Sequence, residues 1–155
     1  LYSKGESIKG GVPLGADTVA RYKYISRNGR VDGYYSGYTF ANQLGVTTQV
    51  PYMVEIVSNN ASARVREVNL HGRRVLLRKA RVLVTKENYR ILQFLDFLKD
   101  IDQYADENDK ILSDRIRKYV VDVQIKKTEI DCYIKQYPDR IYRYIYEMRL
   151  YDVFA

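Results

Sequence analysis

Residues 33–51 read GYYSGYTFANQLGVTTQVP, a stretch that combines three glycines, many small polar side chains and a closing proline. Ser36 is a candidate N-cap, and Gly45 fits the position just after a helix end, with apolar residues one helical turn apart between them. Thr47–Pro51 is predicted to be extended, because the residue before a proline disfavours the helical region. The stretch therefore predicts a short helix between two extended segments.

The chain after the proline is predicted to form a small sheet. Tyr52–Val57 is an apolar-rich run with the length of a strand. Ala63–Leu70 and Arg74–Arg78 flank a turn at Asn69–Gly72 and predict a hairpin. Val82–Val84 is predicted as a further short strand.

Helical spacing of apolar residues appears on both sides of this region. On the N-terminal side, Asp17 or Thr18 caps a predicted short helix that ends near Asn28–Gly29. The other helices are predicted from Thr85 to Ile101, over 111–119 after a break at 106–109, from a capping box at Thr128–Asp131 to Pro138, and after a cap at Asp139.

The predicted fold class is α+β, with short N-terminal helices, a small mostly antiparallel sheet containing a basic hairpin, and a C-terminal helical section. Residues 1–15 are rich in Gly, Ser and Lys and are interpreted as a linker or loop. Residues 16–104 are predicted to form the α+β core, and 105–155 a helical section packed on it. At 155 residues and 46% hydrophobic, the chain is expected to be a single domain overall.

The composition excludes several classes of site. One cysteine and one histidine are too few for a structural zinc site, which takes about four such ligands. Few cysteines favour a cytoplasmic protein. No apolar run approaches the roughly 18–20 residues that span a bilayer, so no membrane is expected as a partner.

Positive charge is concentrated in the predicted hairpin. The formal net charge is +7, which raises the chance of an acidic partner. The hairpin face is either simply solvated or a surface for nucleic-acid phosphates or an acidic protein. The candidate basic patch consists of Arg64, Arg66, Arg73, Arg74, Arg78 and Lys79.

Catalytic and cofactor motifs are weak. Asp32 and Glu55 could hold magnesium in a metal-dependent nuclease if a lysine followed the second carboxylate, but Glu55–Val57 lacks it. The glycines at 33, 37 and 45 match no phosphate-binding loop. The sequence therefore predicts no catalytic, cofactor or metal residue. Tyr142 and Tyr146, four apart on the last predicted helix, are candidate interface residues.

One family resemblance emerges from these motifs. Ser36–Gly37 with Asn42–Pro51, followed by a strand, Asn59 and a basic hairpin ending Leu76–Lys79, resembles the AbiEi-type antitoxin family of type IV (abortive-infection) toxin–antitoxin systems. The residues carried over as structural or interaction candidates are Ser36, Asn42, Thr47, Thr48, Gln49 and Pro51.

The resemblance implies a two-part protein. An N-terminal winged helix-turn-helix would bind promoter DNA, and we expect it to precede this chain, which begins at Leu1. The C-terminal domain would bind or antagonise a nucleotidyltransferase-like toxin, with the parent protein repressing its own operon. The expected function is thus a non-enzymatic antitoxin or transcriptional-regulator domain. The alternatives are a nucleic-acid-binding domain and a degenerate metal-dependent nuclease-like domain.

Overall fold

The computed structural model describes residues 16–49, 51–104 and 109–155. They form an α+β fold, as predicted, and the described part contains seven α-helices. The chain divides into two compact units: the first unit contains Leu1–Tyr35 and Tyr52–Lys86, and the second contains Ser36–Pro51 and Glu87–Ala155. These boundaries differ from the expected division at residue 104. No helix of the described chain is both long enough and apolar enough to cross a membrane.

The first unit is built on a four-stranded sheet with the order β3-β4-β6-β5. The strands are β3 (Gly33–Tyr35), β4 (Val54–Ser58), β5 (Val65–Leu70) and β6 (Arg73–Lys79). β3 pairs with β4 and β5 with β6 in antiparallel fashion, whereas the central pair β4–β6 is parallel. The sheet is mostly antiparallel, as predicted, with this one parallel exception.

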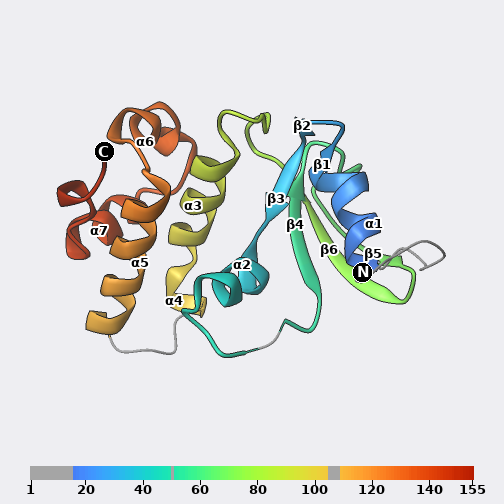
Figure 1. Ribbon diagram of the computed structural model, residues 1–155, viewed down its shortest axis with the longest axis horizontal. Coiled ribbons are helices and arrows are strands. Elements are labelled where there is room, and N and C mark those ends of the chain that lie inside the picture. Colours follow the sequence, from blue (N-terminus) through green and yellow to red (C-terminus); the bar gives the residue numbers. More distant parts are fainter. Residues whose placement is uncertain (1–15, 50, 105–108) are drawn as a thin grey trace. The chain divides into compact units, whose positions relative to one another are not determined.

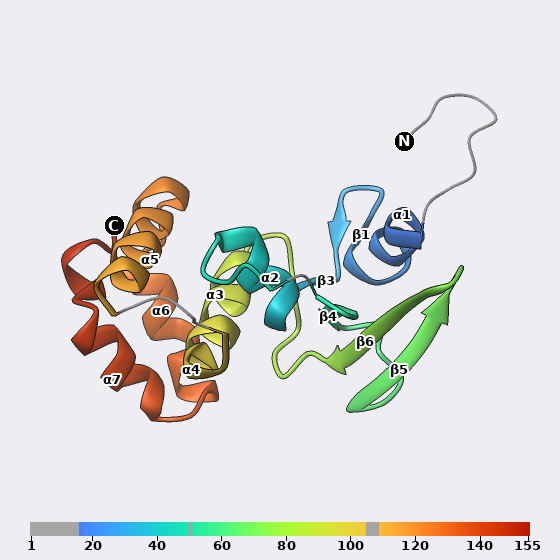
Figure 2. The same cartoon turned by 90° about the horizontal axis from the view of Figure 1, so that it is seen from below.

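One face of the sheet is covered by the N-terminal helical segment. This segment comprises α1 (Ala16–Ala20) and a π-helical turn, η1 (Arg21–Ile25). It overlaps the β5–β6 ribbon in the view of Figure 1, and Figure 2 shows that it lies on one side of that ribbon. Burial of apolar surface between the two layers stabilises this unit. Its core consists of Ala20, Tyr24, Val54, Ile56, Ala61, Val75 and Leu77.

The helix expected to run to Asn28–Gly29 instead ends at Ile25, three residues earlier than Asn28. A two-stranded hairpin follows η1, with β1 (Ser26–Arg27) paired to β2 (Arg30–Val31). Asn28 and Gly29 form its two-residue turn, with φ angles of 53° and 81°. An Asn-Gly pair suits both a helix end and a hairpin turn of this kind. The predicted hairpin at Asn69–Gly72 is confirmed, and its turn residues are His71 and Gly72.

The second unit is helical. Its first element is α2 (Gly37–Leu44), for which the sequence analysis predicted both ends. Gly45 follows in the left-handed region at φ 79°, and the N–H of Val46 bonds back to the carbonyl of Ala41 at 3.1 Å. Such a helix end places a residue where a Cβ is disfavoured, which explains the glycine.

The remaining helices of this unit lie in the C-terminal half. They are α3 (Tyr89–Lys99), α4 (Ile101–Tyr104), α5 (Asp109–Val123), α6 (Lys127–Tyr133) and α7 (Arg140–Glu147), with 3₁₀ turns η2 (Ile134–Gln136) and η3 (Leu150–Asp152). α3 contacts α2, α6 and α7. The stripe predicted for the last helix is buried at Ile141, Tyr144, Ile145 and Met148.

One predicted strand and the starts of two predicted helices are corrected. Val82–Val84 is not a strand, because the main chain of Val84 bonds to a side chain rather than to a neighbouring strand. The helix expected from Thr85 begins at Tyr89, with Asn88 as N-cap. The helix expected at Thr128 begins at Lys127, and no side chain caps it. The predicted break at 106–109 falls mostly on 105–108, outside the described residues.

A cluster of aromatic rings explains why α2 belongs to the helical unit. Phe40 on α2 meets the rings of Phe97 and Tyr119 edge-to-face, with centroids 5.8 and 5.9 Å apart. Phe94 stacks on Tyr119 at 5.9 Å. Such pairs add to the stabilisation from buried area. They tie α2, α3 and α5 together, so the stretch that follows β3 folds with helices far away in the sequence.

Tyr119 is expected to make the stability of the second unit sensitive to alkaline pH. Burial raises its pKa from 10.0 to about 12, although Arg90 lowers it in part. The phenol is neutral when protonated, so this stabilisation is complete below pH 10 and is lost as pH rises through about 12. Between these values the unfolded state releases the proton first, and the free energy of unfolding falls by about 1.4 kcal/mol per pH unit.

Urea denaturation across this pH range tests the prediction in three proteins. Tyr119→Phe should abolish this part of the pH dependence, whereas Tyr146→Phe, at a position 80% exposed, should leave it unchanged. Parallel losses of stability in the wild type and in Tyr119→Phe would show that another group is responsible.

Candidate functional site

The polar triplet Ser58–Asn60 organises one end of the sheet in the first unit. The Ser58 hydroxyl is fully buried, donates to the Tyr24 carbonyl at 2.6 Å and accepts from the N–H of Asn60 at 3.0 Å. The Asn60 amide donates to the Lys23 carbonyl at 3.3 Å and to Asp32 Oδ2 at 3.2 Å. These bonds hold η1 and the β2–β3 connection against the end of β4.

Asn59 performs the same task for the chain that leaves β6. Its side-chain amide donates to the Val84 carbonyl and accepts from the Val84 N–H, both at 2.9 Å. The side chain thereby acts like a strand neighbour for a single residue. This pairing satisfies both main-chain groups of a buried residue, which would otherwise be costly.

The parallel pairing of β4 and β6 determines what else gathers at this end. Ser58 lies opposite Lys79, so β4 and β6 finish at the same end of the sheet. The N–H of Lys79 bonds to the carbonyl of Arg64 at 3.0 Å, which brings the start of β5 to this end of the sheet as well. The β1–β2 hairpin also lies at this end, the upper one in Figure 1.

Six of the exposed cationic side chains on these converging segments form one set. They are contributed by η1, the β1–β2 hairpin, the β5 region and the end of β6. We call this set the basic strand end, and it consists of Lys23, Arg27, Arg30, Arg64, Arg66 and Lys79.

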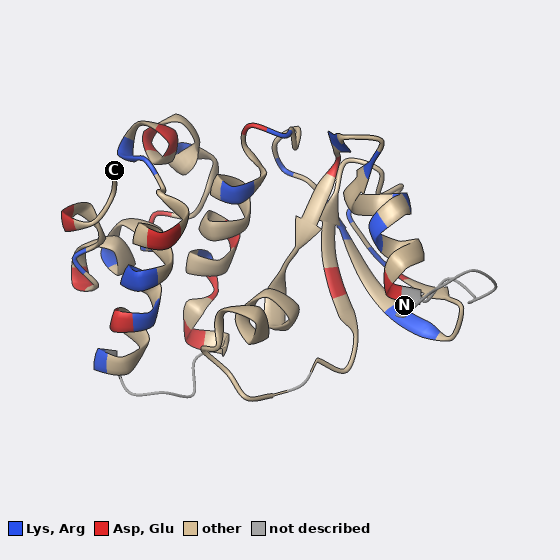
Figure 3. Ribbon diagram, viewed as in Figure 1, with Lys and Arg blue, Asp and Glu red and all other residues tan. Residues whose placement is uncertain are grey.

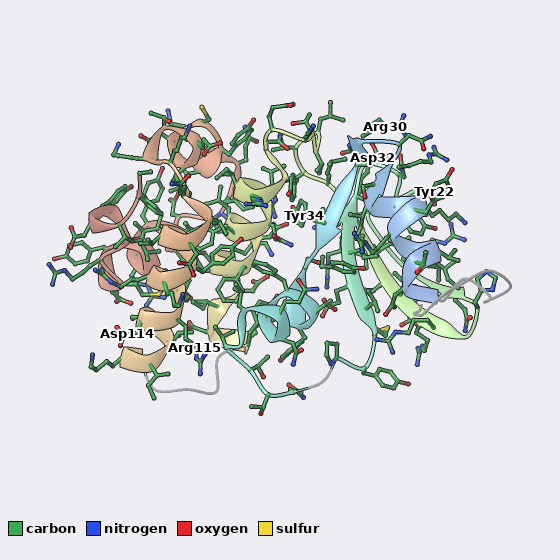
Figure 4. The ribbon with its side chains drawn as sticks, viewed as in Figure 1. Tyr22, Arg30, Asp32, Tyr34, Asp114 and Arg115 are labelled. Atoms are coloured by element: carbon green, nitrogen blue, oxygen red, sulfur yellow. The ribbon has the colours of Figure 1, made fainter. Side chains whose placement is uncertain are left out.

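Only one of the six has an acidic partner among the residues that the structure describes. Arg30 pairs with Asp32 at 3.0 Å, and the two lie together in Figure 4. The other three described acids of the first unit pair elsewhere, with Arg73, Arg74 and Arg78. The basic strand end therefore keeps most of its charge available to a partner.

The charge of the protein is segregated between the units. The described residues of the first unit include 12 Lys and Arg against 4 Asp and Glu. Those of the second unit include 12 of each sign, so they carry no net charge. Figure 3 shows the contrast, with acidic residues concentrated on the helices. The positive potential therefore belongs to the sheet unit.

The predicted basic patch is divided by the hairpin geometry. Paired residues of a sheet share a face, and Arg66 lies opposite Leu77, whereas Arg74 and Arg78 lie on the other face. Arg74 bonds to Glu67 and to the Tyr52 hydroxyl, and the bond to Glu67 raises the pKa of its guanidinium. Arg64, Arg66 and Lys79 belong to the basic strand end, and the other three patch residues form ion pairs.

The carboxylates of the nuclease alternative are not brought together. Gly33 pairs with Ser58, which separates Asp32 from Glu55 by four residues along the ladder, or about 13 Å. Each carboxylate binds an arginine, Asp32 with Arg30 and Glu55 with Arg78 at 3.0 Å. One magnesium ion cannot reach both. Within the described residues, no three His, Cys, Asp or Glu side chains are grouped to hold a metal ion.

The motif residues of the 36–51 stretch lie in the second unit. The Asn42 amide donates to the carbonyls of Thr47 and Gln49 at 3.5 and 3.2 Å, and the Gln49 N–H bonds to Thr47 Oγ1 at 3.1 Å. Ser36 is the predicted N-cap residue, but its buried hydroxyl makes no cap bond. This network of hydrogen bonds holds the residues that follow α2 against the helix.

The other motif residues are more accessible. Thr48 and Gln49 expose their side chains, and Pro51 is half-buried. On α7, Tyr142 and Tyr146 are exposed as predicted, at 43% and 80%. The motif residues and the basic strand end thus lie in different units.

Sequence reasoning missed half of the basic strand end. Lys23, Arg27 and Arg30 were not connected with the hairpin, and Ser58 and Asn60 were not identified as its organisers. The available signal was the run Ser58–Asn60, three polar residues directly after an apolar strand, because buried polar groups of this kind need partners.

The resemblance to AbiEi-type antitoxins stays a prediction from the sequence, because no family model, curated protein or solved structure matches the chain.

Proposed function

We propose that this protein binds nucleic acid through the basic strand end of its first unit. The observation that carries the proposal is the convergence of six exposed cations at one end of the sheet. Five of them have no acidic partner in the described chain. Exposed Lys and Arg neutralise phosphates and release counterions, which supplies most of non-specific nucleic-acid affinity. The hydrogen bonds of Ser58–Asn60 hold the segments that carry these cations.

Charge reversal is the direct test of this proposal. We expect Arg64→Glu with Lys79→Glu to weaken binding to a labelled oligonucleotide by about tenfold or more at low salt. The dependence of log affinity on log salt should become shallower by about one unit for each phosphate that the variant no longer binds. Fluorescence anisotropy over a salt series measures both quantities.

The matched control carries the same charge change on the second unit. Lys126 and Lys135 are exposed there, and Lys126→Glu with Lys135→Glu should reduce affinity far less. Equal losses in the two double variants would mean that net charge alone drives binding. Affinity that does not depend on salt would exclude a phosphate interface.

The antitoxin role is a second proposal and adds a protein partner. It is supported by the motif stretch, whose Thr48 and Gln49 side chains are exposed beside the closed Asn42–Thr47 network. In this proposal the protein antagonises a nucleotidyltransferase-like toxin, and the parent protein represses its own operon. Co-expression with such a toxin tests it: rescue of growth that Thr48→Ala with Gln49→Ala removes is the expected result, and no rescue by the intact chain would reject it.

A further inference from the structure

An exposed tyrosine, Tyr22, lies beside the basic strand end. Tyr22 lies on η1, directly before Lys23, and its side chain is 56% exposed. The guanidinium of Arg27 lies 5.4 Å from its ring centroid. Figure 4 labels Tyr22 on this segment, near Arg30 and Asp32. An aromatic ring and several exposed cations are thus offered to solvent together.

The anchored backbone of η1 and a contact with Arg27 position this ring. Tyr24, two residues further on, is buried in the core of the unit and anchors η1. Arg27 belongs to β1 and is paired with Arg30 across the hairpin, and its contact with Tyr22 joins η1 to this hairpin. A ring that is already held loses less conformational freedom when a ligand stacks on it.

Duplex and single-stranded nucleic acids use such a surface differently. Phosphates are available in both, but the flat face of a base is available for stacking only when the base has left its own stack. Proteins that bind single strands combine a cationic track with aromatic side chains on which bases stack. A cationic surface without an exposed aromatic residue lacks this stacking contribution.

We propose that the basic strand end binds single-stranded nucleic acid, with a base stacked on Tyr22 and the flanking phosphates on Lys23, Arg27, Arg64 and Lys79. This inference rests on the proposed function and specifies its ligand. The 56% exposure of Tyr22 and its contact with Arg27 carry it. Tyr52, although more exposed, is bonded to Arg74, whose guanidinium pairs with Glu67.

Affinities of Tyr22 variants for a thymidine oligonucleotide and for its duplex with the complementary strand test the proposal. We expect Tyr22→Ala to weaken single-strand binding about tenfold and to change duplex binding by less than about twofold. Tyr22→Phe should bind the single strand like the wild type, because the ring is retained. Tyr146→Ala removes an exposed tyrosine from the second unit and should change neither affinity. Circular dichroism checks that each variant is folded.

The possible outcomes separate this inference from the proposed function. If Tyr22→Ala weakens single-strand and duplex binding equally, or weakens neither, stacking on Tyr22 is rejected while the Arg64 and Lys79 result stands by itself. If the charge-reversal variant also binds both nucleic acids normally, both proposals fail. Loss of binding in Tyr22→Phe would assign the effect to the hydroxyl and likewise reject stacking.

Discussion

Gly33→Ala is expected to lower the free energy of unfolding of the first unit by about 3 kcal/mol or more. A Cβ at this position would lie 2.4 Å from the Val57 carbonyl oxygen and 2.5 Å from that of Tyr24. Both neighbours are main-chain atoms, so no side-chain rotation relieves the clash. The glycine lies where η1 and the β3–β4 pair approach each other closely.

The surrounding hydrogen bonds make relaxation costly. Gly33 is paired with Ser58 in the β3–β4 ladder, and the Ser58 hydroxyl holds the Tyr24 carbonyl at 2.6 Å. Moving η1 away from the sheet would break the latter bond and leave buried polar groups without partners. The change should therefore disturb the same hydrogen bonds that support the basic strand end.

Chemical denaturation followed by circular dichroism measures the loss. Gly72→Asn is the matched control: it has open space around it at φ 84°, and asparagine tolerates the left-handed region, so its cost should stay below about 1 kcal/mol. Hydrogen exchange should show weakened protection of β3 and β4 in Gly33→Ala. A variant as stable as Gly72→Asn would mean that η1 moves aside freely.

The elements that could be predicted from the sequence have local causes. α2 is marked by its terminal residues Ser36 and Gly45, α7 by one apolar stripe, and the β5–β6 hairpin by its turn. The same local signals were ambiguous at Asn28–Gly29, because a positive φ serves a helix end and a hairpin equally well. Periodicity cannot choose between them.

Other features that were predicted wrongly depend on partners remote in the sequence. Val84 has an apolar strand-like pattern around it, yet its partner is the side chain of Asn59. The membership of α2 in the helical unit depends on Phe97 and Tyr119. Neither interaction leaves a mark in the periodicity of the segments involved.

The candidate site likewise depends on segments that are remote from one another in the sequence. The concentration of positive charge in the hairpin predicted a basic patch, but the parallel pairing of β4 with β6 decides which of these cations lie at the same end of the sheet as Lys23 and Arg30. A parallel neighbour is not implied by a hairpin, since it needs a connection through other elements. Half of the predicted patch was therefore found at the site, and half in ion pairs away from it.

The second large effect is expected from Phe94→Ala in the second unit. Phe94 is fully buried on α3 and stacks on Tyr119 of α5 at 5.9 Å. Removing a buried phenylalanine ring costs about 3–5 kcal/mol, because apolar burial is forfeited and a cavity is left behind. The effect should be near the upper end, because Tyr119 also packs edge-to-face on Phe40 and cannot move into the space without breaking that ring pair.

A smaller replacement separates volume from ring stacking. Phe94→Leu retains most of the buried apolar surface and is expected to cost about 1–2 kcal/mol. Urea denaturation of the two variants below pH 10 keeps Tyr119 protonated in both states and isolates the packing term. In Phe94→Ala, greater exposure of Tyr119 to water should also bring its pKa back toward 10, which ultraviolet titration detects. An alanine variant that is destabilised no more than the leucine variant would show that the helices close around the cavity, and that the aromatic pairs are not what binds α2 and α5 to α3.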